Sequence, residues 1–207
     1  MAESFFTNFN AQAFQSQLGN VAQLNNFAAS ITLPSGIVSL IPNGDQFARK
    51  VSFAIRAAEK PEMSISEISV PFRGGSRFRI PGDRDYTATW NVTCRFDIKN
   101  TIYNAFEGWN DAIVGNVDSD SAFADDDISQ VMGVGELFQL SRNGRIIKAW
   151  SIANIWPSVV GSISYDWSAE NTIVEVPVTF VMSHMESEVT RNNVISEQDL
   201  LSGTVIF

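Results

Sequence analysis

Hydrophobic and polar residues alternate with a period of two along several stretches of this chain. The clearest run covers residues 88–96, and the same alternation occurs in residues 47–57, 65–72, 163–167 and 174–180. The apolar members of the clearest run are Ala88, Trp90, Val92, Cys94 and Phe96. Because successive side chains of a strand point to opposite faces of a sheet, these stretches predict antiparallel strands with one buried face each.

One stretch has the period of a helix instead. Residues 100–114 carry apolar side chains at spacings of four, three and four, at Ile102, Phe106, Trp109 and Ile113. Asn100 stands where a side chain can cap the first turn. Farther along, Asn143 and Gly144 form a dipeptide that favours a tight hairpin turn. Together the patterns predict a mainly β fold, an antiparallel β-sandwich or barrel with one covering α-helix.

Composition divides the chain into three parts. Residues 1–44 contain no acid after Glu3 and no lysine or arginine, and they are rich in Asn, Gln, Ala and Phe. We interpret them as an N-terminal extension that contacts other subunits. Residues 45–182 hold the strand and helix patterns and are expected to form one β domain. Residues 183–207 are polar and charged with an apolar end, which indicates a C-terminal arm.

Charge and cysteine content exclude several functional classes. The chain has 14 Lys and Arg against 23 Asp and Glu, a net charge of -9. Stable nucleic-acid binding relies on lysines and arginines that displace counterions from phosphates, so this charge argues against it. Cys94 is the only cysteine, which excludes an intrachain disulfide and a Cys-rich metal site. The chain shows neither a signal-peptide pattern at its start nor an uncharged apolar run of about 18 residues. We therefore expect a chain that is made and folded in the cytosol and has no membrane partner.

No side chain points to catalysis or to a cofactor. His184 is the single histidine and has no evident nucleophile or orienting partner, so we expect a structural or solvated role. Cys94 lies on the apolar face of its predicted strand and is expected in the core. The acidic run 118–127 fails the calcium-loop template, because Phe123 and Ser129 occupy the places of the required glycine and glutamate. The sequence predicts no catalytic residue, no cofactor site and no metal site.

Two groups of residues are candidates for contacts between subunits. The nearly uncharged N-terminal stretch carries Phe5, Phe6, Phe9 and Phe14, and exposed apolar residues of this kind mark interaction surfaces. Four arginines stand close together in this acidic chain, at Arg73, Arg77, Arg79 and Arg84. Such arginines commonly pair with carboxylates across a subunit contact. Patterned strands with extensions and no active site are typical of a self-assembling protein.

Two blocks of sequence resemble the tail tube proteins of contractile-tailed bacteriophages, a family related to the tube rings of contractile injection systems and type VI secretion. The first block is RFRIPGDRDYTATWNVTCRFD followed by IYNAFEGWNDAIVG, a turn with Gly-Asp, an alternating strand and a helix with an aromatic-Xaa-Xaa-Trp pattern. The second is IANIWPSVVGSISYDWSAENTIVEVPVTF, with Trp-Pro, Gly, Asp-Trp, a polar turn and a final alternating strand. The resemblance covers about residues 45–182, and both extensions and the acidic loop depart from it.

The resemblance implies a structural protein of the virion tail. Hexameric rings of such proteins stack into a hollow tube inside a contractile sheath, and each subunit adds strands to a continuous inner β-barrel. The implied partners are further copies of the chain, the tail sheath protein, the baseplate and tail terminator proteins, the tape measure protein and, transiently, genomic DNA during ejection. Assembly is expected in the host cytoplasm.

Within such a ring, the polar faces of the best strands are expected to line the lumen. The candidates are Thr87, Thr89, Asn91, Thr93, Glu175 and Thr179. The acids of the chain either face the channel, where they keep DNA mobile by repulsion, or face the sheath. Two alternatives stay open: the tube of an injection system that delivers protein cargo, which a neutral, small-residue lumen wall favours, and a soluble β-sandwich binding module that uses the acidic loop.

Overall fold

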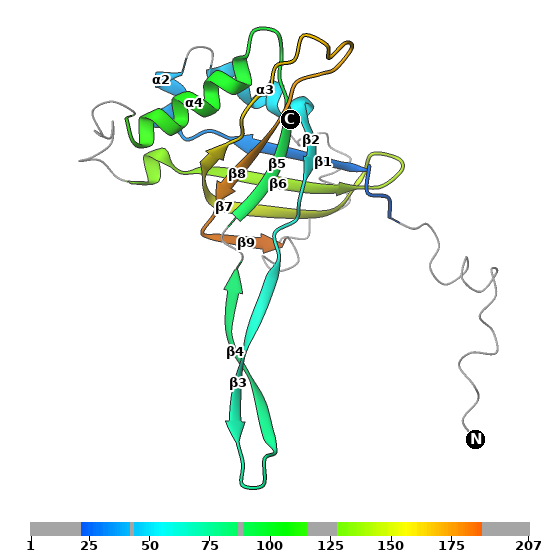
Figure 1. Ribbon diagram of the computed structural model, residues 1–207, viewed down its shortest axis with the longest axis vertical. Helices are drawn as coiled ribbons and strands as arrows, with labels where there is room; N and C mark the ends of the chain where they lie inside the picture. Colours follow the sequence, from blue (N-terminus) through cyan, green and yellow to red (C-terminus); the bar gives the residue numbers. More distant parts are fainter. Residues whose placement is uncertain (1–21, 42–43, 87–88, 116–127, 188–207) are drawn as a thin grey trace, which may run out of the picture.

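The structure is a computed structural model that describes residues 22–41, 44–86, 89–115 and 128–187. These residues form a strand-rich body from which one long hairpin extends (Figure 1). All strand pairs of the described residues are antiparallel. The prediction of a mainly β, antiparallel fold is confirmed.

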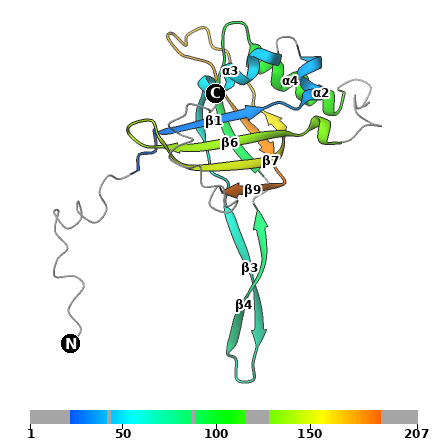
Figure 2. The same ribbon diagram turned by 180° about the vertical axis from the view of Figure 1, so that it is seen from behind.

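The body is built on a seven-stranded sheet in which β7 joins two halves. The strands are β1 (Phe27–Thr32), β6 (Gly133–Leu140), β7 (Ile146–Val160), β8 (Glu175–Val181), β5 (Thr89–Arg95) and β2 (Ile55–Ala58), in this spatial order, and β9 (His184–Ser187) pairs with β7. The first part of β7 pairs with β6, and its end, from Trp156 to Val160, pairs with β8. Figure 2 shows β1, β6, β7 and β9 as the layer in front, with β5 and β8 behind it.

The two halves of the sheet enclose the core. The inward residues of β5 and β8 are Trp90, Val92, Cys94, Val176, Val178 and Phe180, and all are buried. The rings of Trp90, Phe106 and Trp109 surround Phe180 at centroid distances of 5.6, 5.7 and 6.2 Å. The alternation that predicted β5 and β8 is therefore confirmed.

Helices cover the end of the body opposite the hairpin (Figure 1). They are α2 (Ser35–Leu40), α3 (Gly44–Ala54) and α4 (Thr101–Ile113), with a 3-10 turn at Ile128–Val131. The predicted helix is confirmed as α4, which buries Ile102, Phe106 and Trp109. No helix in the described ranges has both the length and the apolar character needed to cross a membrane.

The prediction of a strand over residues 47–57 and of a single helix is wrong. Residues 44–54 form α3, and only Ile55–Ala58 is extended. The segment carries two patterns at once, since Phe47 and Val51 are four residues apart while Val51, Phe53 and Ile55 alternate. The helical pattern prevails because Phe47 packs edge to face on Phe106 of α4, with ring centroids 5.4 Å apart. Phe53 is left 92% exposed.

The cap of α4 also differs from the prediction. Asn100 has a left-handed φ of 51° and makes no side-chain cap hydrogen bond. Asp97 takes that role, because its Oδ1 accepts a hydrogen bond from the Thr101 backbone N–H at 2.8 Å. The predicted turn at Asn143 and Gly144 is confirmed between β6 and β7, with Gly144 at a φ of 75°.

The long hairpin consists of β3 (Met63–Pro71) and β4 (Arg77–Tyr86), which pair only with each other among the described strands. It continues the direction of β2 and β5 away from the body (Figure 1). Pro81 fits into β4 where the register shifts opposite Ile65 and Glu67, since an irregular two-stranded ladder tolerates a missing N–H donor. Gly82 and Asp83, which belong to the turn of the first resembling block, lie within β4.

The predicted strand over residues 163–167 is wrong as well. β7 ends at Val160, and residues 161–174 contain no strand. Tyr165 is 78% exposed and Trp167 fully exposed. Alternating aromatic residues form a half-buried strand only where another layer covers one face, and none of the described residues does so here.

The stretch before α3 contributes to the same core. Ala29 and Ile31 of β1, Leu33, and Ile37 of α2 are buried, and β1 pairs with β6 along its whole length. These residues fall within the segment expected to be an N-terminal extension. Likewise β9, within the expected C-terminal arm, pairs with β7.

Candidate functional site

The outward face of β5 and β8 brings together the predicted lumen residues that the structure describes. They are Thr89, Asn91, Thr93, Glu175 and Thr179, which alternate along β5 and β8 with buried residues such as Trp90, Val92 and Val178. Asn91 lies opposite Thr179 in the ladder, and the Thr179 hydroxyl donates a hydrogen bond to Asn91 Oδ1 at 3.0 Å. Thr87 lies outside the described residues.

Two arginines hold Glu175 on this face. Arg95 Nε of β5 is 3.1 Å from Glu175 Oε1, and the guanidinium of Arg56 contacts the other carboxylate oxygen. Ile55 of β2 pairs with Cys94 and faces the core, so the next residue, Arg56, projects to the outward face. Sequence reasoning missed this cluster, because the partners are brought together only by the register of three strands.

The charges on this face balance. Asn91 Nδ2 donates to Glu59 Oε2 at 3.1 Å, which places Glu59 beside the same ladder. The ionised side chains of the cluster are two arginines, Arg56 and Arg95, and two glutamates, Glu59 and Glu175. The chain's net charge of -9 is therefore not expressed on the described part of this face.

The groups considered for chemistry do not form a reactive site. Burial raises the pKa of the Cys94 thiol to about 12, so the thiol stays protonated and inert. His184 Nε2 lies 3.8 Å from Glu186 Oε1 on the same strand. Across the described ranges, no three His, Cys, Asp or Glu side chains cluster as metal ligands would. The acidic run 118–127 lies outside these ranges.

The four candidate arginines all lie on the β3–β4 hairpin. Arg73 is in its turn, while Arg77, Arg79 and Arg84 are on β4, and each is exposed. Arg79 Nη1 pairs with Glu67 Oε2 of β3 at 3.0 Å. From Ile68 to Ile80 the chain carries three arginines and no acid, so the outer part of the hairpin is basic.

The same hairpin exposes large apolar side chains. They are Met63, Ile65, Ile68, Phe72, Phe78 and Ile80, each at least 41% exposed. Sequence reasoning missed this surface, because alternation shows that a strand has an apolar face but not whether a core covers it. The other inter-subunit candidates, Phe5, Phe6, Phe9 and Phe14, lie outside the described residues.

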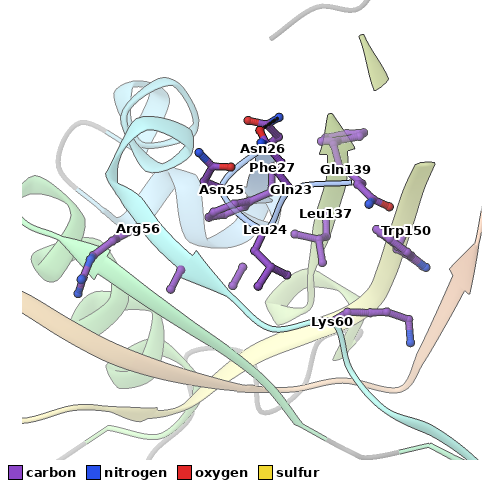
Figure 3. Close-up of a pocket in the computed structure, with 13 residues that line it drawn as sticks. Gln23, Leu24, Asn25, Asn26, Phe27, Arg56, Lys60, Leu137, Gln139 and Trp150 are labelled. Carbon is purple, nitrogen blue, oxygen red and sulfur yellow. Dashed lines mark hydrogen bonds between the residues drawn. The ribbon is translucent and has the colours of Figure 1, made fainter. Parts of the chain in front are cut away.

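A groove of about 710 Å³ opens between β1 and β6 on one side and β2 on the other (Figure 3). Phe27, Leu137 and Trp150 supply apolar lining, and Arg56 and Lys60 bring positive charge. None of its lining residues is acidic. Its lining carries no set of catalytic groups.

Comparison with known proteins gives one informative sequence relative. No family model matches the chain. The tail tube protein of Serratia phage KSP90 is 30% identical to it over 157 residues, which are 76% of this chain and 83% of the relative.

Solved structures share the fold at low sequence identity. The tube-terminating cap of the anti-feeding prophage superposes with a TM-score of 0.54 at 15% identity, covering 81% of this chain and 91% of that chain. A chain of the sheath–tube complex of an extracellular contractile injection system, PVC, in its extended state superposes with a TM-score of 0.54 at 13% identity, covering 86% and 97%. At such low sequence identities, these two structures show that the fold is shared and nothing more.

The phage relative establishes the family, and the resemblance of the two sequence blocks is thereby confirmed. A tail tube protein is a structural component of the virion tail, and the expectation that the chain is not an enzyme agrees with this relative. From its sequence relationship and its fold, this chain belongs to the phage tail tube proteins and is a structural tube subunit.

Proposed function

We propose that this chain forms hexameric rings that stack into the hollow tube of a contractile phage tail. The observation that supports the ring is a pair of unpaired strand edges on one half of the sheet. Among the described strands β2 pairs only with β5, and Trp156–Val160 of β7 pairs only with β8. β2 of one subunit pairs with this end of β7 in the next, which removes two exposed edges and continues the sheet around the ring.

In this ring the outward face of β2, β5 and β8 lines the channel. Thr89, Asn91, Thr93, Glu175 and Thr179 belong to that wall, and Thr87, just before β5, completes the set. Arg56 and Arg95 are each engaged by Glu175, so they offer little free charge to phosphates. A wall of small polar groups and paired ions lets DNA pass without retaining it, because retention grows with each phosphate that a cation neutralises.

Contacts between rings come from the β3–β4 hairpin. An isolated two-stranded hairpin is marginally stable in water, and the exposed Phe72 and Phe78 favour a surface that another subunit covers. Its basic tip suits a second copy of this chain, whose overall charge is negative. Arg73, Arg77, Arg79 and Arg84 are the proposed polar part of that contact.

The ends of the chain add to these contacts. Because β1 and α2 belong to the core, the N-terminal contribution comes from the residues before β1, chiefly Phe5, Phe6, Phe9 and Phe14. We keep the proposed division of the chain into three parts: an extension over residues 1–44, a β domain over residues 45–182 and an arm over residues 183–207. In this division β1, α2 and β9 belong to the extension and the arm but pack on the domain.

The further partners follow from the place of a tube in a tail. We expect a sheath protein around the tube, a baseplate and a tail terminator at its ends, and the tape measure protein and then genomic DNA inside it. The similar solved structures include a chain of a sheath–tube complex and a tube-terminating cap, which supports this set. Assembly in the host cytoplasm is part of the same proposal.

A second candidate is the tube of an injection system that conducts protein cargo. The balanced charges of Arg56, Arg95, Glu59 and Glu175 favour it, since a neutral wall of small residues suits a protein as well as DNA. The phage relative favours the DNA conduit.

Electron microscopy of the purified protein tests the proposal. The wild-type chain is expected to give rings and tubes, whereas Phe72→Asp together with Phe78→Asp should leave single rings, because two charges replace the apolar contact of the hairpin. The matched control is Val134→Asp, an exposed valine of β6 on the body, which should still form tubes. Tubes of normal length from the hairpin variant would contradict stacking by the hairpin, and monomers at high concentration of the wild-type chain would contradict the ring.

A further inference from the structure

A loop at the end of the body opposite the hairpin exposes large apolar side chains. This aromatic loop covers residues 161–174 between β7 and β8, and Figures 1 and 2 both show it at the same end as the helices. Trp167 is fully exposed, Tyr165 is 78% exposed and Ile173 is 61% exposed. Ile98, in the turn that follows β5, is fully exposed as well. Exposed apolar groups of this size mark an interaction surface.

The register of the sheet explains where this loop lies. β5 begins just after the hairpin, and its far end, Arg95, lies opposite Glu175, the first residue of β8. Beyond that pair, the Phe96 backbone N–H donates a hydrogen bond to the Val174 carbonyl at 3.3 Å. The aromatic loop therefore lies at one end of β5 and β8, and the hairpin extends from the other end. When rings stack head to tail, the hairpin of one subunit points toward the loop end of a subunit in the next ring.

These two ends of the molecule carry opposite charge. The aromatic loop contains Asp166 and Glu170, both exposed, and no lysine or arginine. The helix α4, at the same end of the body, adds Glu107 and Asp111, against one lysine, Lys99, in the turn before it. The outer part of the hairpin is basic and apolar, whereas the aromatic loop is acidic and apolar. The two surfaces are therefore complementary in charge and alike in apolar character.

We infer that the aromatic loop is the surface on which the β3–β4 hairpin of a subunit in the neighbouring ring docks. The aromatic side chains of the loop pack on Phe72 and Phe78. The two acids of the loop compensate Arg73 and Arg77. Because two different surfaces of the chain meet, this contact repeats from ring to ring without closing, as a tube of stacked rings requires. The inference rests on the proposed stacking through the hairpin and identifies the second half of that contact.

Electron microscopy of two complementary variants tests this pairing of hairpin and loop. The loop variant combines Tyr165→Lys with Trp167→Lys, which replaces two exposed aromatic groups by cations that repel the basic hairpin. It should give single rings, as should the hairpin variant, Phe72→Asp with Phe78→Asp. An equimolar mixture of the two kinds of ring should give pairs of rings and nothing longer, because each pair brings one intact hairpin surface onto one intact loop surface.

The matched control, Val134→Lys with Ile147→Lys, replaces two exposed apolar residues of β6 and β7 and should form tubes like the wild-type chain. Tubes from the loop variant, or a mixture whose rings stay single, would overturn docking on the loop and leave the proposed rings intact. Monomers from the loop variant would also overturn it, because the loop would then act within a ring. So would single rings from the control, since added charge alone would then explain the loss. Monomers of the wild-type chain would contradict the proposed function and the inference with it.

Discussion

Trp90 of β5 lies in the core and reaches Gly135 of β6, in the other half of the sheet. It is 1% exposed, and a Cβ atom at Gly135 of β6 would stand 2.6 Å from its ring. Real side chains do not approach so closely, so glycine at this position is required by contact with a rigid indole rather than by backbone conformation.

We expect Gly135→Ala to lower the free energy of unfolding by about 1–3 kcal/mol, the usual cost of overpacking a core. The matched control is Gly108→Ala in α4, where the nearest atom is Cγ1 of the flexible Ile41 side chain at 3.3 Å and alanine favours the helix. Urea unfolding of both variants measures the difference. Equal stabilities of the two variants would show that Trp90 can shift.

Asp97 links α3 to the start of α4. Burial tends to raise the pKa of Asp97, but hydrogen bonds from Lys50, the Thr101 backbone N–H and the Thr101 hydroxyl outweigh it, and the pKa lies below its ordinary value. A carboxylate with a lowered pKa in the folded state stabilises the protein above its unfolded pKa of about 3.9 and loses this contribution as the pH falls through the folded pKa.

Asp97→Ala should therefore cost about 1 kcal/mol near neutral pH, the typical effect of losing a helix cap. The cost should shrink as the pH falls below about 4, because the wild-type carboxylate then becomes protonated. Denaturant unfolding near neutral pH and at about pH 3 measures this change in cost. Asp83→Ala on the exposed hairpin is the control. A cost that stays constant down to about pH 3 would exclude the charged hydrogen bonds as its source.

At the scale of elements, α3 shows how tertiary contacts select between two local patterns. A strand over residues 47–57 would place Val51, Phe53 and Ile55 on one face, whereas the helix buries Phe47 and Val51 and leaves Phe53 exposed. The contact of Phe47 with Phe106 of α4 exists only in the helix. Packing of a helical face stabilises a helix more than propensity does.

Two phenylalanine variants separate these structures. Phe47→Ala should cost about 3–5 kcal/mol, as for a fully buried aromatic residue. Phe53→Ala should change stability by less than about 0.5 kcal/mol, because its side chain lies in solvent in the single chain. Thermal melts of the two variants measure the contrast. A large effect at both positions is the result a strand would give, because alternation puts Phe47 and Phe53 on the same face of a strand.

At the scale of the whole molecule, charge is unevenly distributed. The outer hairpin is basic from Ile68 to Ile80, while the chain as a whole carries a net charge of -9. The proposed channel wall is balanced, because Glu175 is shared by Arg56 and Arg95. Reversing the charge of Glu175 would bring three cations together and disturb the sheet, so it is a poor probe of the channel.

Thr93→Lys is a better probe, because Thr93 lies on the same face and its ladder partners, Ala57 and Pro177, are uncharged. If this face lines the channel, one added cation per subunit should slow DNA ejection at low salt and have less effect at high salt, since added contacts are salt-dependent. Val134→Lys on the body is the control and should leave ejection unchanged. Normal ejection from Thr93→Lys particles at low salt would count against the channel wall.

The sequence by itself determined the strands β5 and β8, the helix α4, the turn at Asn143 and Gly144, and the family. These elements were predictable because their patterns are unambiguous over several residues, and the family because two long blocks combine turn, strand and helix signals. The alternation also placed Thr89, Asn91 and Thr93 on one face, since side-chain direction in a strand follows from the period of two alone.

Only the tertiary structure decided the rest. α3 needed Phe106 to select its helical pattern, and the aromatic residues at positions 165 and 167 needed a covering layer that the described fold does not provide. The cluster of Arg56, Arg95 and Glu175 depends on the register of three strands, and the apolar hairpin surface depends on β3 and β4 leaving the body. Local pattern reports which side chains share a face, but what covers that face is set by residues far away in the chain.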